Sequence, residues 1–186
     1  MNEIKNTDRC FFTQQVFLIG TYNEDYTENF APISWVSFTS GIKSCLIISM
    51  GGEKQTKRNL ERTGMLSATV LTPDLLPFAE CCNAYTKNSA LINNVKPEFE
   101  KGTKLDVPLI MNAKWSYECR VVHTVEHYES HTYFAEFEKV NVRSDIKELD
   151  FIDLRVINPV IYSPNNYFTV GEHLGEIGDY SKKQIV

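Results

Sequence analysis

Residues 31–64 read APISWVSFTSGIKSCLIISMGGEKQTKRNLERTG, and this stretch decides the interpretation of the chain. It joins a polar and aromatic strand, an apolar strand at residues 45–49 and a basic helix that begins after Gly51 and Gly52. The start of a helix presents free N–H groups and the positive end of its dipole, and glycine lets an anion approach the backbone. The stretch therefore predicts a phosphate site beside a strand that lines a flat ligand, as a phosphorylated aromatic cofactor requires.

Lys54 and Thr56 are the expected phosphate ligands, with Asn59 or Lys57 as helpers. An ammonium group, a hydroxyl group and helix N–H groups together make charge-assisted hydrogen bonds to a dianion. Lys57 and Arg58 lie near the same turn, but the basic residues of this helix cannot all contact one ligand, because neighbouring helix positions point in different directions. The alternative interpretation is an ordinary helix whose lysines are solvated.

Two common nucleotide motifs are missing from this stretch. No Gly-Lys-Ser or Gly-Lys-Thr follows a first glycine at the spacing of a P-loop, and the three-glycine dinucleotide fingerprint does not occur. A dinucleotide held in the Rossmann manner is therefore not expected, whereas NAD(P)H remains open as a transient co-substrate.

The composition is that of an ordinary globular protein. The chain has 186 residues, of which 42% are hydrophobic and 23% charged, and its net charge is -5. These values fit one domain over residues 1–186, with a core at about residues 10–180 between a polar arm and a polar tail. The negative charge argues against nucleic acid as a partner. Residues 1–6 are polar and no run reaches the ~18 apolar residues of a membrane helix, so we expect a cytoplasmic protein without a membrane partner.

The five cysteines are scattered and form no Cys-x-x-Cys pair, which fits a reducing compartment better than a disulfide framework. Cys45 and Cys119 lie in apolar runs and are expected in the core. The adjacent Cys81 and Cys82 raise the question of a redox role. One buried and one partly exposed thiol beside a helix end is the favoured interpretation.

Short β-branched and aromatic runs, separated by turn residues, indicate strands along most of the chain. Gly64 is expected to end the helix at residues 53–62, and Thr72 and Pro73 to begin a second helix. Residues 83–104 show little periodicity and are expected to cross the surface irregularly. The strands are expected at residues 16–21, 30–39, 44–50, 65–71, 109–112, 115–128, 132–142 and 160–162, the last of which closes the sheet.

Many short strands without regular strand–helix alternation favour an antiparallel barrel over a doubly wound sheet. The arms at residues 115–128 and 132–142 form the clearest hairpin, because both are rich in β-branched and aromatic residues. A polar arm at residues 1–11, a short helical turn within residues 145–153 and disorder past Tyr180 complete the expected organisation.

Seven segments, taken in order, carry a family resemblance: VFLIGT at residues 16–21, NFAPISWVS at 29–37, CLIIS at 45–49, KQTKRNLERTG at 54–64, DVPLI at 106–110, YEC at 117–119 and HTYF at 131–134. With the tail from Gly171 to Gly178, they resemble the flavin reductase-like, FMN-binding split-barrel family, and within it the flavoredoxin-like branch. The resemblance implies a mainly β fold, a split, Greek-key-like antiparallel barrel with a few short helices.

The same resemblance implies bound FMN, a homodimer, and electron transfer between NAD(P)H, flavin and acceptor proteins. A flavin ring performs the redox chemistry itself, so the protein supplies binding, orientation and electrostatics. Backbone N–H groups and the hydroxyls of Ser34 and Ser37 would hold the ring, and Trp35 would pack on it or lie in the core. By resemblance, Tyr167 and Gly171 close over the cofactor or the dimer seam. The candidate cofactor residues are Ala31, Pro32, Ile33, Ser34, Trp35, Ser37, Ser49, Lys54, Thr56, Lys57, Asn59 and Tyr167.

Three histidines, His123, His127 and His131, are spaced four residues apart. On a helix they would align as metal ligands, but their neighbours are strand formers, and in a strand each step of four spans about 13 Å. No metal site is therefore expected. By resemblance, His131 lies near the flavin or the nicotinamide and is the candidate catalytic residue, able to change charge near neutral pH. A plain turn histidine is the alternative.

The chain also departs from the family pattern at two places. Glu129-Ser130-His131 stands where family members commonly read Gly-Asp-His, and residues 95–99 read VKPEF where Asp-Lys-Phe is common. The interpretation that remains is an FMN-dependent oxidoreductase, of the NAD(P)H:flavin reductase type, acting on free flavin or another acceptor. Its alternatives are an electron carrier with bound FMN and little NAD(P)H oxidation, or a non-enzymatic module that binds another ligand.

Overall fold

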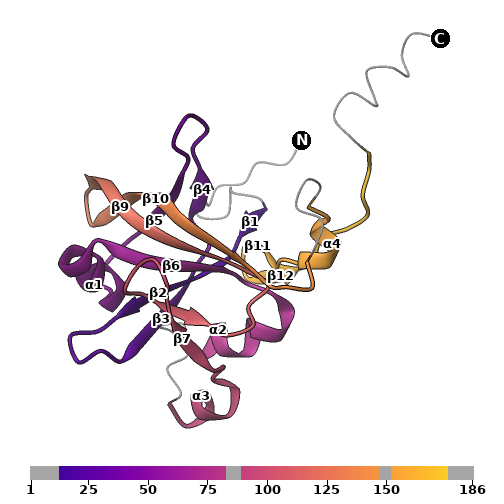
Figure 1. Cartoon of the computed structure of the whole chain (residues 1–186), viewed down its shortest axis with the longest axis horizontal. Coiled ribbons are helices and arrows are strands. Elements are labelled where there is room, and N and C mark those ends of the chain that lie inside the picture. Colours follow the sequence, from indigo (N-terminus) through magenta and orange to yellow (C-terminus); the bar gives the residue numbers. More distant parts are fainter. Residues whose placement is uncertain (1–12, 83–88, 147–151, 176–186) are drawn as a thin grey trace, which may run out of the picture.

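Antiparallel strands dominate the computed structural model, which describes residues 13–82, 89–146 and 152–175 (Figure 1). The main sheet has seven strands in the order β3-β2-β6-β9-β10-β5-β4, and all of its neighbouring pairs are antiparallel. Its strands are β2 (Phe17–Tyr22), β3 (Glu28–Ile33), β4 (Val36–Phe38), β5 (Cys45–Met50), β6 (Met65–Val70), β9 (Trp115–His127) and β10 (Ser130–Val142).

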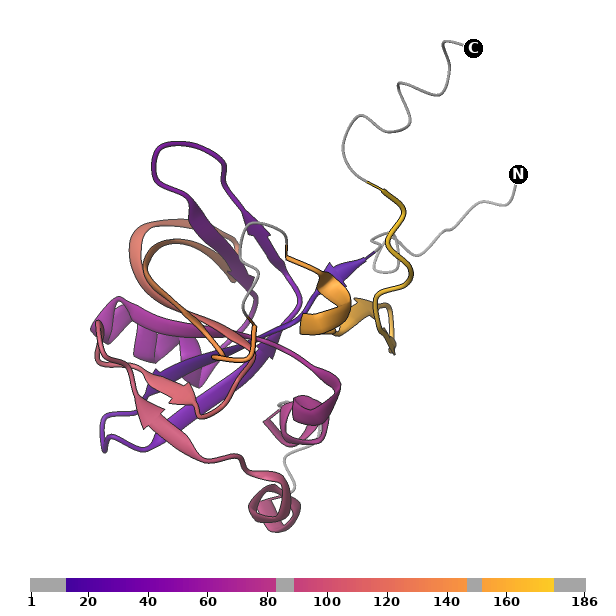
Figure 2. The ribbon, with the colours of Figure 1, turned by 45° about the vertical axis from the view of Figure 1, so that its right-hand side comes forward.

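The two edge strands of this sheet, β3 and β4, are consecutive in the chain. Only Ser34 and Trp35 separate the end of β3 from the start of β4, and a link of that length spans at most about 11 Å. The sheet must therefore curl until its edges lie side by side, which makes an almost closed barrel with one gap. In Figure 2 the long β9–β10 hairpin bends around the barrel and the β4–β5 hairpin rises beside it. The predicted antiparallel barrel is confirmed.

The barrel interior is filled by alternating side chains of the curled strands. Phe17 and Ile19 of β2 point into this core, together with Leu46 and Ile48 of β5. Leu60 of helix α1 (Gln55–Thr63) joins the same cluster, so α1 packs against one part of the barrel. The helix ends at Gly64, as predicted, and begins two residues later than predicted.

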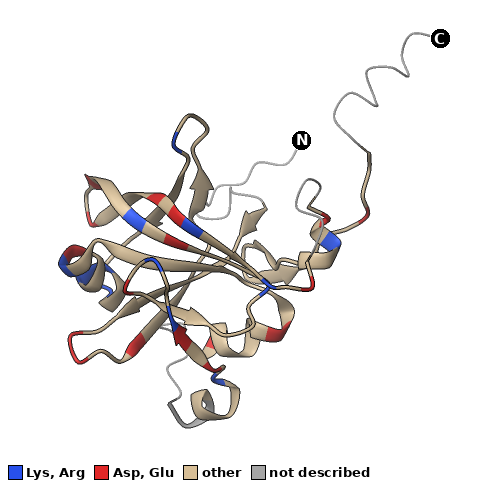
Figure 3. Cartoon of the chain, in the orientation of Figure 1, with Lys and Arg blue, Asp and Glu red and all other residues tan. Residues whose placement is uncertain are grey.

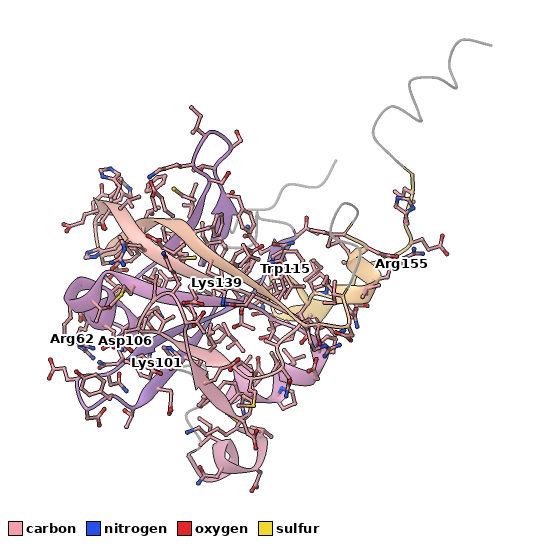
Figure 4. The ribbon with its side chains drawn as sticks, viewed as in Figure 1. Arg62, Lys101, Asp106, Trp115, Lys139 and Arg155 are labelled. Atoms are coloured by element: carbon pink, nitrogen blue, oxygen red, sulfur yellow. The ribbon has the colours of Figure 1, made fainter. Side chains whose placement is uncertain are left out.

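A second apolar cluster covers the opposite face of β2. Val16 and Leu18 alternate with the inward residues and pack against Phe78 of helix α2 (Leu76–Cys82), which follows a 3-10 turn, η2 (Pro73–Leu75). A small two-stranded flap, β7 (Phe99–Lys101) and β8 (Pro108–Ile110), lies on this side too, and Figure 4 shows Lys101 beside Asp106, to which it is paired at 3.0 Å.

A separate three-stranded sheet is formed by the two ends of the chain. This sheet, which we call the mini-sheet, has the order β1 (Gln14–Gln15), β11 (Ile161–Ser163) and β12 (Asn166–Phe168). Its last two strands follow the short helix α4 (Leu154–Ile157). The expectation that residues 160–162 close the main sheet is therefore wrong, because β11 pairs with β1 and β12 instead.

Two other expectations are corrected. Residues 30–39 do not form one strand, because the chain leaves one edge of the barrel at Ser34 and joins the other edge after Trp35. The irregular segment expected over residues 83–104 contains helix α3 (Ser89–Val95) and strand β7.

The polar arm, Cys10, residues 83–88, residues 147–151 and the tail past residue 175 lie outside the described residues. Within the described part, Cys45 and Cys119 are buried, as predicted. No helix of that part is long and apolar enough to cross a membrane.

Candidate functional site

A cavity of about 510 Å³ opens at the gap of the barrel. One of its walls is formed by Pro32 and Ile33 at the end of β3 and by the link residues Ser34 and Trp35. This placement follows from the topology, because the link crosses from one edge strand of the barrel to the other; Trp35 has already joined the second edge, where its carbonyl accepts from the N–H of Ser49 at 2.9 Å. The rest of the lining comes from four other places in the chain: Val16, the end of β5 with the turn that follows it (Ser49, Met50, Gly51, Gly52 and Lys54), Glu129, and the mini-sheet residues Tyr162 and Tyr167.

A second cavity of about 380 Å³ adjoins the first, and both are lined by Pro32, Ile33 and Lys54. The second cavity reaches the start of α1, where Thr56 and Arg58 line it. The two hollows together form one cleft, which we call the barrel cleft. It offers a polar and aromatic end for a flat group and a basic end for an anion.

The basic end presents unpaired donors. Lys54 is the N-cap residue of the nine-residue helix α1, and its own side chain makes no capping hydrogen bond among the described residues. The first N–H groups of a helix have no partner within the helix, and its dipole places positive potential there. Figure 3 shows basic residues of α1 interspersed with acidic ones, and Arg58 is indeed paired with Glu53 at 3.5 Å. Lys54 has no ion pair among the described residues, so it is the available cation of the cleft.

Thr56 and Asn59, both predicted phosphate contacts, are buried. The Thr56 hydroxyl accepts a hydrogen bond from Asn29 at 3.0 Å, which leaves its proton free to be donated into the second cavity. Asn59 is 1% exposed and donates to Thr21 and Asn23, both at 3.0 Å. Asn59 therefore holds α1 against the barrel and lines neither part of the cleft.

Lys57 is also turned inward. Its side-chain nitrogen donates to the carbonyl oxygen of Gly52 at 3.1 Å and to that of Glu129 at 3.0 Å. The ammonium group therefore lies behind the wall of the cleft, between the turn that follows β5 and the turn of the β9–β10 hairpin. Lys57 itself is not among the residues that line either cavity.

His131 shares its face of β10 with the buried Tyr133 and lies beside Glu61 of α1. It pairs in register with Met50, whose side chain is buried in the barrel core, and its Nδ1 lies 3.3 Å from the hydroxyl of Tyr133 and 3.5 Å from Glu61 of α1. His131 lines neither cavity. Among the described residues, no three His, Cys, Asp or Glu side chains converge as the ligands of one metal ion would.

The mini-sheet contributes an aromatic wall. Tyr162 and Tyr167 face the cleft with ring centroids 5.9 Å apart, and the Tyr167 hydroxyl donates to Glu80 of α2. Burial and the adjacent Glu80 carboxylate raise the pKa of Tyr167 above its ordinary value, so the phenol stays protonated and keeps this hydrogen bond. The bond fastens β12 across the cleft to α2.

Cys82, the last residue of α2, lines the second cavity, and Cys81 precedes it in the same helix. Both are partly exposed, whereas one buried thiol was expected. Burial, reinforced by the neighbouring Cys81, raises the pKa of Cys82 to about 12. The thiol is therefore protonated at neutral pH and is a poor nucleophile.

The cleft gathers nine of the twelve predicted cofactor residues and leaves out three, together with the catalytic candidate His131. Ser37 lies on the outer face of β4, paired in register with Ile47, and is exposed. Trp35 is 50% exposed and so is not part of the core. The cleft residues that the prediction did not include as contacts are Val16, Asn29, Phe30, Met50, Gly51, Gly52, Glu53, Gln55, Arg58, Cys82, Glu129 and Tyr162. The predicted residues that line the cleft are Ala31, Pro32, Ile33, Ser34, Trp35, Ser49, Lys54, Thr56 and Tyr167, and those outside it are Ser37, Lys57, Asn59 and His131.

Comparison with known proteins identifies the fold. The family model described as the flavin reductase like domain matches residues 9–171, which is most of the chain, so the chain belongs to this family. Among curated proteins, no sequence matches this chain significantly.

Solved structures with the same fold include flavin-related proteins of low sequence identity. Flavoredoxin of Desulfovibrio vulgaris (Miyazaki F) is 20% identical, with a TM-score of 0.84 over 97% of this chain and 100% of that one. A flavin reductase with a split barrel domain from Shewanella frigidimarina is 19% identical, with a TM-score of 0.78 over 89% of this chain and 85% of that one. An FMN-binding protein of Thermus thermophilus is 14% identical, with a TM-score of 0.73 over 95% of this chain and 96% of that one. The chain therefore has the split-barrel fold, and its family supports a flavin-related oxidoreductase.

Proposed function

We propose that this protein binds FMN in the barrel cleft and passes electrons from NAD(P)H through it to free flavin or another acceptor. The observation that carries the proposal is the continuity of the cleft: one cavity is polar and aromatic, and the next ends at an uncapped helix start with Lys54 and Thr56. A cofactor with a flat ring and a terminal phosphate matches both ends. The Thermus thermophilus protein of the same fold is itself named as FMN-binding.

The residues present fit this cofactor by the chemistry of their donors. At the basic end, the Lys54 ammonium, the Thr56 hydroxyl and the free N–H groups of the first turn of α1 would hold a phosphate dianion. At the other end, the hydroxyls of Ser34 and Ser49 supply polar contacts, and Trp35 and Tyr167 supply aromatic surface. The bound flavin would supply the redox chemistry, since its ring accepts a hydride and becomes negatively charged. The residues of the cleft orient the ring and limit the access of water.

An electron carrier with bound FMN and little NAD(P)H oxidation is the second candidate. The position of His131 favours it, because the histidine that the resemblance links to the nicotinamide points toward Tyr133 and Glu61 instead of the cleft. Stopped-flow mixing of the flavin-loaded protein with NADH and NADPH separates the two. Rapid bleaching of the flavin supports the reductase, and bleaching that takes minutes supports the carrier.

We also propose that the protein is a homodimer. On the outer face of the barrel, Ile47 of β5 pairs in register with Phe134 of β10, and Val125 of β9 pairs with Thr132 beside them. Val125 is 44% exposed, and Ile47 and Phe134 are only partly covered. These side chains form an apolar strip over three strands of a single protomer, bordered by Thr132 and His123, and a second copy would bury it.

The experiment that tests FMN binding compares FMN with riboflavin, which lacks the phosphate. Lys54→Ala combined with Thr56→Val removes hydrogen bonds to a charged group, and the loss of one such bond costs about 2 kcal/mol, so FMN affinity falls at least about 30-fold. Riboflavin affinity stays within about twofold of wild type. Lys104→Ala, which removes an exposed lysine outside the cleft, is the matched control. Equal losses for both ligands would show that the phosphate is held elsewhere.

A further inference from the structure

Lys57 is a lysine whose charged end is buried. The residue is 6% exposed, on the face of α1 that packs against the barrel. Its ammonium group donates to two backbone carbonyls, those of Gly52 and Glu129, and both residues line the larger cavity of the cleft. Lys57 thus joins two loops that are more than 70 residues apart in the sequence.

This ammonium group has no carboxylate partner. None of the ion pairs among the described residues includes Lys57. Removing a charge from water is costly, and carbonyl dipoles repay only part of that cost because they carry no net charge. The wall of the cleft therefore has an uncompensated positive charge directly behind it. Salt screens such a buried charge much less than it screens the exposed Arg58.

The two joined loops form one wall. Gly52 has φ +65, a left-handed conformation that favours glycine. Its carbonyl accepts one of the two hydrogen bonds from Lys57. A Cβ added at Gly51 would lie 3.3 Å from the Ser130 hydroxyl, so the turn after β5 packs closely on the turn of the β9–β10 hairpin. Both carbonyl oxygens accept from the same nitrogen, so without the ammonium group their partial negative charges would repel each other.

We propose that Lys57 is a positioning residue that fixes this wall of the cleft and, through its buried charge, makes the protein bind the reduced flavin more tightly than the oxidised flavin. The inference rests on the proposed binding of FMN in the cleft. The oxidised ring is neutral and the reduced ring carries a negative charge, so a fixed cation in a low-dielectric wall stabilises the reduced ring selectively. A higher midpoint potential of the bound flavin is the consequence.

The test measures the two-electron midpoint potential of the bound flavin in Lys57→Met, Lys57→Gln and Lys57→Arg. Methionine removes the charge and both hydrogen bonds, glutamine removes the charge but keeps an N–H donor, and arginine keeps the charge. We expect Met and Gln to weaken reduced FMN about tenfold more than oxidised FMN, which lowers the potential by about 30 mV. Arg keeps the wild-type potential. Lys104→Ala is the control, because it removes an exposed lysine outside the cleft and should leave the potential unchanged.

A second measurement does not depend on the cofactor. In the flavin-free protein, amide hydrogen exchange at Gly52 and Ser130 is expected to accelerate at least tenfold in Lys57→Met, while exchange in the centre of β9 stays unchanged. Circular dichroism establishes that each variant is folded before either comparison is made, and Lys57→Gln serves where Lys57→Met does not fold.

The outcomes are separable. A wild-type protein that binds no flavin would overturn the proposed function, whereas the exchange measurement would still test the wall. A Gln variant with the wild-type potential, or an Arg variant with a potential as low as that of Met, would overturn the role of the charge. Unchanged exchange at both loop positions would overturn the positioning role.

Discussion

At the scale of single residues, buried polar side chains fix the loops of this barrel. Glu118 of β9 is fully buried, and its carboxylate accepts from the N–H groups of Lys104 and Leu105 at 2.8 and 2.7 Å and from Asn141 at 3.2 Å. Burial alone would raise the pKa of Glu118, but the hydrogen bonds from Leu105, Asn141 and Lys104 together hold it below its ordinary value. The carboxylate thereby anchors the loop between β7 and β8.

Glu118→Gln is expected to destabilise the protein by about 2 kcal/mol at pH 7, because hydrogen bonds to a charged acceptor are stronger than those to an amide. Since the folded pKa is lowered, this contribution is complete above the pKa of the unfolded carboxyl, about 4.3. It is lost as the pH falls through the folded value. Urea unfolding of both proteins from pH 7 to pH 3 checks the difference. A gap that stays constant down to pH 3 would contradict the assignment.

Tyr167→Phe tests the fastening of the mini-sheet over the cleft. The ring remains but its hydrogen bond to Glu80 is lost, so we expect about fivefold weaker FMN binding, equivalent to about 1 kcal/mol. Glu80→Gln, which keeps an acceptor, should lose less. Fluorescence titration with FMN measures the affinity of both variants. An unchanged affinity in Tyr167→Phe would show that the hydrogen bond to Glu80 does not help to hold the ligand.

At the scale of the elements, helix α1 places the basic end of the cleft, and Gly64 ends it. Gly64 has φ 64, and its N–H bonds to the carbonyl of Leu60 at 2.8 Å. No atom lies within 4 Å of an added Cβ, so Gly64→Ala costs only the backbone strain of a left-handed residue, about 1 kcal/mol. Urea unfolding should show a lower midpoint with an unchanged slope. Gly171→Ala, at an equally open position without positive φ, should be neutral, and an equal loss there would contradict this account.

The elements also show how far the sequence predicts the structure. The β9–β10 hairpin and α1 were predictable, because alternation and the Gly64 stop are local signals. The break at Ser34 was not, because the strand-like pattern continues through the residues that cross the gap. The predicted place of β11 in the main sheet was wrong, since strand pairing depends on residues far away in the chain.

The same limit applies within the candidate site. Lys54 and Thr56 were predictable from their place at a helix start. The inward turn of Lys57 could have been found from Leu60, three residues later, because positions three apart share one helix face. No local signal marked Tyr162 or Glu129, which reach the cleft only through the tertiary fold.

At the scale of the whole molecule, the curled sheet leaves an apolar strip on its outer face. For a dimer, light scattering would give a molar mass of twice the chain mass of 21.4 kDa. Phe134→Glu places a charge in the strip and should shift the protein to monomer at micromolar concentration, whereas Lys104→Glu, an exposed position off the strip, should not. A wild-type monomer at every concentration would contradict the proposal.

The most direct measurement for the central claim is a crystal structure of the protein grown with FMN. The account predicts the phosphate at the first turn of α1, within hydrogen-bond distance of Lys54 and Thr56, and the ring along Pro32 to Trp35. A cleft that remains empty at saturating FMN, or a phosphate bound away from the start of α1, would contradict it.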